Sequence, residues 1–153
     1  MDERYLFKGK RADDGTWICG DLISTRGKYY IHPNANSFEV NAYNLAKCVQ
    51  MIEVIPETVG QCTGLKDKNG KWIFGNDIVK LTDTTHNEEL KACITFGNPF
   101  NEYNWGWSLM FMGKKRKVDT DILLWVEMEE TGVYCEVIGN IYDDNSELLE
   151  ATR

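Results

Sequence analysis

Apolar and polar residues alternate along much of the chain, a pattern that predicts strands with one buried face. The alternation is clearest in Leu90–Phe96 and Trp105–Phe111, where every second side chain is apolar and is predicted to point into a core. The other predicted strands are shorter and are bounded mostly by Gly, Asn or Pro: Trp17–Ile23, Lys28–His32, Phe38–Val40, Gln50–Ile55, Val59–Thr63, Lys71–Phe74, Asp77–Leu81, Asp121–Glu129 and Val133–Tyr142.

Two short turns are expected to connect neighbouring strands. Arg26-Gly27 is predicted to close a first hairpin, and Asn69-Gly70 supplies the two positive-φ residues of a type I′ turn. Helix is expected to be scarce. Asn41–Gln50 fits either a short helix or an irregular segment, and Glu147–Glu150 is predicted to form a last helical turn.

The closely spaced strands predict a mainly β protein. Because closure removes exposed strand edges, we expect a small closed barrel of SH3-like type in the C-terminal two thirds, preceded by an N-terminal β-hairpin region. The corresponding division is residues 1–57 and 58–153, although one continuous domain fits the pattern as well.

The composition is that of a globular protein. Of the 153 residues, 42% are hydrophobic and 27% charged, which excludes a disordered or fibrous chain. The longest apolar runs, such as Ile122–Val126, are far shorter than the ~20 residues of a membrane-spanning helix. Met1–Arg4 is charged, and no apolar stretch follows it, so we expect a soluble, cytoplasmic protein without a signal peptide or a membrane partner.

Charge is distributed unevenly along the chain, whose formal net charge is −7. Residues 1–117 hold 16 basic and 14 acidic residues, whereas residues 118–153 hold one basic residue and ten acids. The basic part ends in Lys114–Lys117, directly before the acidic part. Either the two parts pair with each other in the fold, or one of them faces a partner. An acidic chain is also a poor general binder of DNA, because phosphate contacts need a net basic face.

Cysteine and histidine give no metal or disulfide pattern. The five cysteines, an odd number, lie far apart in apolar surroundings and are expected to be reduced, and the two histidines have no ligand-like spacing: Cys19, Cys48, Cys62, Cys93, Cys135, His32 and His86. We therefore expect neither a metal nor a cofactor.

Three parts of the chain carry motifs that are shared with a known family. They are Pro56–Phe74 followed by Asp77-Ile78-Val79, Glu136–Tyr142 followed by Glu147-Leu148-Leu149, and Phe7–Arg11 followed by Gly15-Thr16-Trp17 and Gly20–Ile23. Together they resemble the YopX family of small proteins encoded largely by bacteriophages and prophages. The resemblance implies a largely β fold, phage origin, a place in the host cytoplasm and no established activity. The chain departs from the family pattern at Cys62, Gly75-Asn76 and Ser146.

The central motif has two interpretations. Its Gly, Asn and Asp residues suit hairpin geometry, with Asp67 bonding its own turn and two glycines in unusual conformations, so the motif set is read as a structural turn: Thr63, Gly64, Leu65, Asp67, Asn69, Gly70 and Asp77. Alternatively, the lysines between them clasp a phosphate: Lys66, Lys68 and Lys71.

Catalysis is the least supported class of function, because no nucleophile, base and orienting group stand together. A non-catalytic protein-interaction module, acting on a host or phage protein or as a homo-oligomer, is the first hypothesis. The alternative is a single-stranded nucleic-acid binder with an aromatic platform beside a basic run: Trp105, Trp107, Lys114, Lys115, Arg116 and Lys117. A core position for both tryptophans is the competing interpretation of that pattern.

Overall fold

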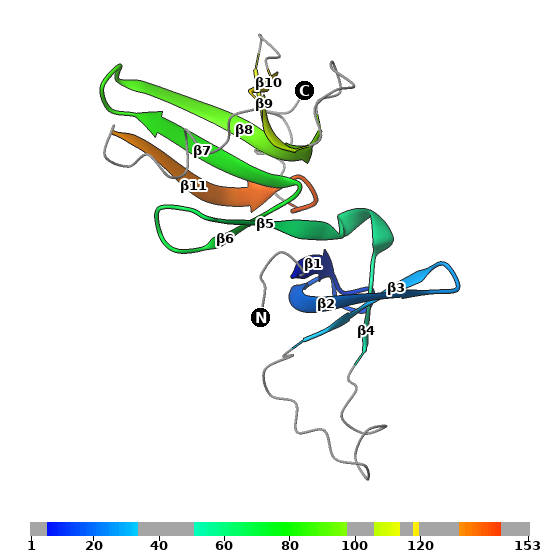
Figure 1. Ribbon diagram of the computed structural model, residues 1–153. Helices are drawn as coiled ribbons and strands as arrows, with labels where there is room; N and C mark the ends of the chain where they lie inside the picture. Colours follow the sequence, from blue (N-terminus) through cyan, green and yellow to red (C-terminus); the bar gives the residue numbers. More distant parts are fainter. Residues whose placement is uncertain (1–5, 34–50, 98–105, 114–117, 120–131, 145–153) are drawn as a thin grey trace. The chain divides into compact units, whose positions relative to one another are not determined.

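The computed structural model describes residues 6–33, 51–97, 106–113, 118–119 and 132–144 (Figure 1). The chain divides into two compact units, Met1–Cys62 and Thr63–Arg153. Within the described ranges the elements are strands and one 3-10 turn, so the predicted mainly β fold is confirmed.

The first unit is an antiparallel sheet with the order β4-β3-β2-β1 and β5 beside β1. Its strands are β1 (Phe7–Lys10), β2 (Trp17–Thr25), β3 (Lys28–His32) and β4 (Ile52–Val54). The predicted first hairpin is confirmed, because Thr25 pairs with Lys28 across Arg26-Gly27. Both turn residues have positive φ, +52° and +77°, as a type I′ turn requires.

The residues at the end of β1 also contact β4, although β2 and β3 lie between these two strands in the order of the sheet. Arg11 forms a bridge with Val54, and the Ile55 amide donates to the Lys10 carbonyl at 2.8 Å. The turn Pro56–Thr58 (η3) follows, where the Thr58 hydroxyl accepts the Lys10 amide at 2.8 Å. A single bridge is not a ladder, so the contact fixes β4 without closing the sheet into a barrel.

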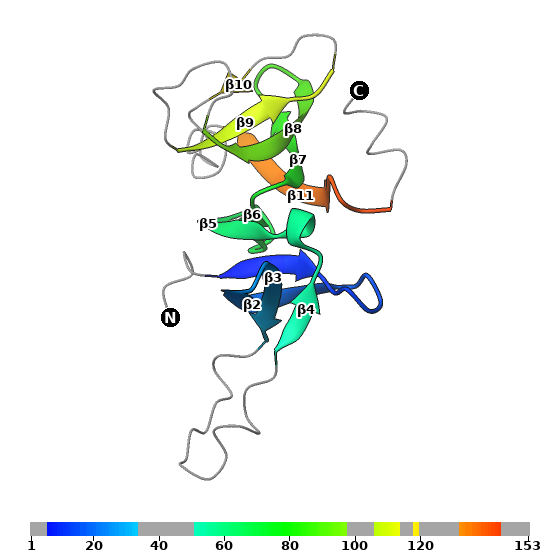
Figure 2. The ribbon, with the colours of Figure 1, turned by 90° about the vertical axis from the view of Figure 1, so that its right-hand side faces the viewer.

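The second unit contains the last part of β5 (Gly60–Lys66), the short β6, and a five-stranded antiparallel sheet in the order β10-β9-β8-β7-β11. Figures 1 and 2 show β7 between β8 and β11. The remaining strands are β6 (Trp72–Phe74), β7 (Asp77–Asp83), β8 (Glu88–Phe96), β9 (Trp107–Phe111), β10 (Val118–Asp119) and β11 (Val133–Asn140).

One side of the five-stranded sheet forms the core of this unit. The predicted alternation is confirmed on this side, because every second residue of β8 and of β9 faces the cluster, although Cys93 and Ser108 on the other side are buried as well. Ile73 of β6 packs on the same cluster: Ile73, Val79, Leu81, Ala92, Ile94, Leu109 and Cys135. β11 carries a bulge between Val137 and Gly139, where two residues of β11 oppose one of β7. Because of the extra residue, the side chains of β11 after the bulge lie on the opposite side of the sheet from the one that strict alternation would give them.

The predicted closed barrel is wrong for the described residues. β10 has two residues and β11 forms its ladder with β7, so the two outer strands of the second sheet are not paired with each other. Local alternation predicts each strand, but it does not determine whether the first and last strands meet. The predicted helical segments Asn41–Gln50 and Glu147–Glu150, and the predicted strands Phe38–Val40 and Asp121–Glu129, lie outside the described residues.

Candidate functional site

The central sequence motif builds the hairpin that joins β5 to β6. The Asp67 amide donates to the Lys71 carbonyl at 2.8 Å, and the Gly70 amide donates to the Asp67 carbonyl at 3.0 Å. Gly70 has a φ of +78°. Asn69 is not among the described non-glycine residues with a positive φ. The connection is therefore a three-residue loop with one left-handed glycine, and the predicted type I′ turn is wrong.

The Asp67 side chain explains the longer loop. Its Oδ1 accepts the amides of Asn69 and Lys71, each at 2.9 Å. A carboxylate that binds the amides two and four residues ahead fixes a wider turn than Asn-Gly alone would form. Asp67 is only 7% exposed, so both hydrogen bonds are largely protected from water.

The same carboxylate connects the hairpin to β11. Asp67 Oδ2 accepts the Val137 amide at 2.9 Å, and the Lys68 amide donates to the Cys135 carbonyl at 2.9 Å. The hairpin tip, residues 67–71, thus satisfies two backbone groups on the side of β11 that faces away from β7. A partner strand cannot add to β11 at this place while the tip is in position.

A second motif carboxylate, Asp77, is fully buried at the start of β7. Its Oδ2 accepts the Phe74 amide at 2.8 Å, and its Oδ1 accepts the side-chain amide of Asn140 at 3.0 Å. Asn140 in turn accepts the Tyr142 amide at 3.0 Å. The central and C-terminal motifs therefore meet through Asp67–Val137 and Asp77–Asn140, which gives both carboxylates a structural role.

The remaining motif residues complete the hairpin. The Thr63 hydroxyl donates to the Ile73 carbonyl at 2.8 Å and accepts the Leu65 amide at 3.1 Å. Gly64 has a φ of +80°, a conformation that is strained for residues with a side chain. Leu65 packs against the core cluster. The motif is thus used to hold the hairpin against the sheet.

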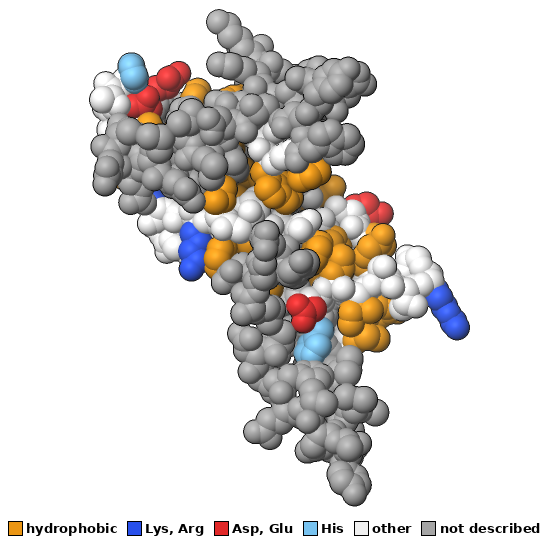
Figure 3. Space-filling model, in the orientation of Figure 1, with side chains coloured by type: hydrophobic (Ala, Val, Ile, Leu, Met, Phe, Trp, Pro, Cys, Tyr) orange, Lys and Arg blue, Asp and Glu red, His pale blue; other side chains and the backbone are white. Residues whose placement is uncertain are grey.

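The outward side chains of this hairpin are mostly cationic. Lys66 Nζ lies 4.3 Å from the centre of the Trp72 ring, within cation–π range. Lys66, Lys68 and Lys71 are exposed and Trp72 is half-buried. Figure 3 shows Lys or Arg side chains beside hydrophobic ones at this hairpin. We call these four residues the lysine–tryptophan face.

An ionic cluster lies next to the lysine–tryptophan face. Glu136 Oε2 of β11 lies 3.4 Å from Lys68 Nζ and 3.4 Å from Lys80 Nζ of β7. Hydrogen bonds from Lys68 and Lys80 lower the pKa of Glu136, so this carboxylate stays ionised at neutral pH. Sequence reasoning missed the pairing, since only the β7–β11 register and the hairpin tip bring these groups together.

The predicted aromatic platform is described only in part. Trp107 packs against the core cluster, and its ring meets Phe96 edge-on, with centroids 5.3 Å apart. Trp107 therefore contributes to packing, while Phe96 is 62% exposed. The other members of the predicted site lie outside the described residues: Trp105, Lys114, Lys115, Arg116 and Lys117.

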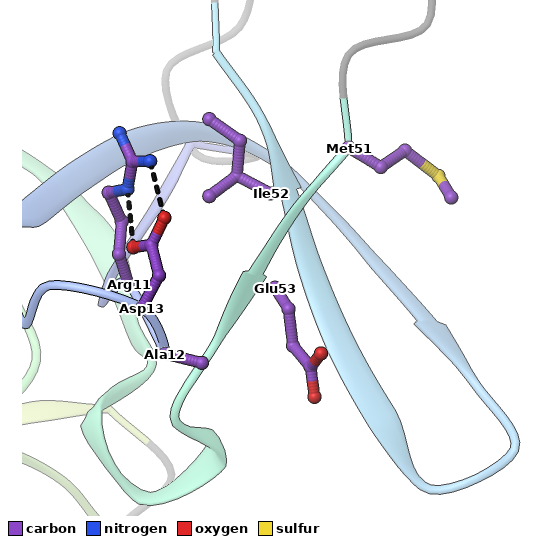
Figure 4. A pocket seen from close by; sticks show the side chains of 6 residues that line it. All are labelled: Arg11, Ala12, Asp13, Met51, Ile52 and Glu53. Carbon is purple, nitrogen blue, oxygen red and sulfur yellow. Dashed lines mark hydrogen bonds and ion pairs between the residues drawn. The ribbon is translucent and has the colours of Figure 1, made fainter.

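A groove of about 440 Å³ lies in the first unit beside β4 (Figure 4). The described residues that line this β4 groove are Arg11, Ala12, Asp13, Met51, Ile52 and Glu53. The Arg11 guanidinium donates from Nε and Nη2 to the two oxygens of Asp13, at 2.9 and 2.7 Å. This fork raises the pKa of Arg11 and lowers that of Asp13. No pattern in the sequence pointed to this groove.

Apolar side chains are exposed next to the groove. Met51 is 45% exposed and Ile55 is 36% exposed, on either side of the exposed Glu53. Figure 4 shows Met51 directed away from the Arg11–Asp13 pair. Sites of protein contact commonly combine Met, Arg and apolar side chains with a polar rim.

The thiols of Cys93 and Cys135 are buried, and the described His86 lies beside a carboxylate. Burial raises the pKa of Cys93 to about 11 and that of Cys135 to about 12, so both remain protonated thiols at neutral pH. The ring of His86 lies 2.8 Å from Asp83 in an exposed turn. Within the described part of the chain, no three His, Cys, Asp or Glu side chains are grouped as metal ligands would be. No helix in the same ranges is both long and apolar enough to cross a membrane.

The sequence matches a known protein family. The sequence model of a family described as YopX protein matches residues 6–150, which is nearly the whole chain. The match includes all three motif segments and therefore both members of the Asp67–Val137 and Asp77–Asn140 pairs. No curated protein matches the sequence.

Proposed function

This chain belongs to the YopX family, and we propose that it is a non-catalytic binding module that recognises a host or phage protein. Phage or prophage origin and action in the bacterial cytoplasm are parts of this proposal. The partner is either another protein or a second copy of the chain.

The observation that carries the proposal is a pair of exposed apolar side chains at the two ends of β4, of which Met51 also lines the groove. Met51 and Ile55 flank β4 and keep 45% and 36% of their surface in water. Beside them, the groove offers the Arg11–Asp13 fork and Glu53 as polar contacts. An apolar contact with charged groups at its margin matches the composition of protein interfaces.

The backbone of β4 favours docking by side chains over strand addition. β3 pairs with one side of β4, and the Lys10–Ala12 segment contacts the other side through the Arg11–Val54 bridge. The Ala12 amide also donates to the Glu53 carbonyl at 2.9 Å. A partner would therefore meet the side chains of this strand and not a free row of amides and carbonyls.

The buried motif carboxylates support a binding role over a catalytic one. Asp67 accepts three backbone amides, and Asp77 accepts one backbone amide and the Asn140 side chain. A general base has to reach a substrate proton at hydrogen-bond distance. Carboxylates that are buried and directed at the chain's own backbone suit a structural use.

Site-directed photo-crosslinking tests the proposal. A photoreactive amino acid in place of Met51 is expected to capture one defined protein from host cells, and the same residue in place of Arg26 provides the control. Arg26 is also exposed in the first unit but lies in the β2–β3 turn. The capture should be lost when Ile55→Glu is added. Identical capture from both positions, or no specific product from position 51, would contradict the proposal.

A further inference from the structure

The β5–β6 hairpin presents positive charge and an aromatic ring on a fixed support. Its inward side chains, Leu65 and Ile73, belong to or pack against the core of the second unit. Its tip is attached to β11 by the Asp67–Val137 and Lys68–Cys135 hydrogen bonds. A surface on an anchored hairpin is already ordered before a ligand arrives, which lowers the entropic cost of binding.

The charge of this surface is not cancelled within the hairpin. Between Thr63 and Phe74 the sequence has three lysines and one acid, Asp67, whose carboxylate is occupied by backbone amides. Glu136 is shared by Lys68 and Lys80, so one acid faces two ammonium groups. Lys66 contacts the Trp72 ring. An anionic ligand is therefore attracted to the lysine–tryptophan face.

The residue types select the kind of anion. The lysines act as point charges toward anionic oxygens and do not by themselves distinguish phosphate from carboxylate, since an arginine fork would suit both, so the distinction comes from the aromatic ring. The Trp72 ring adds a flat partner for an unpaired base, and lysines beside an aromatic ring are the combination found in single-strand binding sites. Paired bases in a duplex cannot stack on a side chain in this way.

We propose that the lysine–tryptophan face binds single-stranded nucleic acid, with Trp72 stacking on a base and Lys66, Lys68 and Lys71 contacting neighbouring phosphates. Lys66 moves from its position over the ring to a phosphate as the base stacks. The inference does not rest on the proposed protein partner, because the β4 groove and this face share no residue.

Fluorescence anisotropy with labelled 12-nucleotide oligo(dT) tests the proposal. Neutralising two lysines together, Lys66→Gln with Lys71→Gln, is expected to weaken binding at least tenfold and to reduce the salt slope by about 1.4, since each phosphate contact on a single strand contributes about 0.7. Arg26→Gln removes one exposed positive charge from the first unit and should change the affinity less than about twofold.

The ring is tested separately from the charge. Trp72→Leu is expected to weaken binding by about 5- to 150-fold, the range of one base–aromatic stack, and Trp72→Phe should restore most of the loss. Thermal denaturation of each variant identifies any loss of fold, and the Trp72→Phe rescue keeps the stacking claim testable if Trp72→Leu is unstable.

Three results would overturn the inference. One is that oligo(dT) does not bind at about 50 mM salt, where phosphate contacts are strongest. Another is an equal loss of affinity in the Arg26→Gln control. The third is a 12-residue polyglutamate peptide that binds at least as tightly and with the same dependence on Lys66 and Lys71, because the face would then recognise an acidic protein segment.

Discussion

The Asp67 carboxylate accepts the backbone amide of Val137 at 2.9 Å, across 70 positions of sequence. The bond joins the tip of the β5–β6 hairpin to the outer side of β11, and it joins the central and C-terminal motif segments, which both lie within the residues matched by the family. A polar residue in a turn is usually explained by the turn alone. Here the same side chain shapes the turn, holds the hairpin against the sheet and covers part of a strand edge.

Replacing Asp67 tests how much this link stabilises the fold. Asp67→Ala removes the acceptor of three amides in a site that is 7% exposed, and we expect the free energy of unfolding to fall by about 3 kcal/mol in urea denaturation. Glu89→Ala, at an exposed position of β8, is the matched control and should stay within about 0.5 kcal/mol of the parent. If the two variants unfold at the same urea concentration, the link has no energetic role.

Gly70 gives a prediction that concerns backbone conformation alone. A Cβ at this position meets nothing within 4 Å, but the φ of +78° is unfavourable for alanine. Gly70→Ala should therefore destabilise the protein by about 1 kcal/mol, and Gly70→Asn by less, since asparagine tolerates this conformation. Thermal denaturation of both variants checks the order. An alanine variant as stable as the parent would show that residue 70 does not hold this conformation.

The local elements of the fold could be predicted from the sequence, and the reasons are visible in the structure. Residues 17–32 form a hairpin because two apolar, β-branched segments are separated by Arg26-Gly27, and all of that information lies within about 16 positions. The strands around Leu90 and Leu109 were predicted because alternation reports one buried face. Phe96 departs from that pattern because it is exposed at the end of β8, and Cys93 and Ser108 depart from it because they are buried on the other side of the sheet.

The relationships between distant segments could not be predicted in the same way. Alternation cannot show that β11 pairs with β7, or that the outer strands stay apart, because pairing depends on chain topology. The turn is not of type I′, because the Asp67 carboxylate accepts the amides of both Asn69 and Lys71 and so holds a longer loop than the Asn-Gly pair alone specifies. The lysines of the candidate nucleic-acid surface were noted, yet their position beside Trp72 and Glu136 emerges only from the folded hairpin.

Thiol chemistry should distinguish exposed from buried cysteines. Cys19 is exposed, whereas Cys93 and Cys135 are buried and have pKa values raised to about 11 and about 12. At pH 8, iodoacetamide should modify Cys19 within minutes and should modify the two buried thiols only after the protein is unfolded in guanidinium chloride. Peptide mass spectrometry gives the extent at each position. Modification of Cys93 in the native protein at the rate of Cys19 would contradict the described burial.

Asp83 gives a pH dependence with a defined sign. Hydrogen bonds from the Thr85 hydroxyl and from His86 lower the pKa of Asp83 to about 2 from its usual 3.8. A lowered pKa stabilises the folded protein above about pH 4, and this contribution is lost as the pH falls toward 2. The difference in stability between the parent and Asp83→Asn should therefore decrease as the pH falls from about 4 to 2 and be mostly lost near pH 2. Urea denaturation at several pH values checks this, and a difference that grows in acid would reverse the assignment.

The lysine–tryptophan face depends most on the Asp67–Val137 bond, because that bond fixes the hairpin on which the face lies. The most direct measurement is the scalar coupling through the hydrogen bond, between the amide nitrogen of Val137 and the carboxyl carbon of Asp67, by NMR on doubly labelled protein. We expect one correlation from the Val137 amide to that carbon, together with those from Asn69 and Lys71. The Asp67 amide should couple to the Lys71 carbonyl and serves as the internal control. If that control is observed and the Val137 correlation is absent, the hairpin is not held to β11 as described.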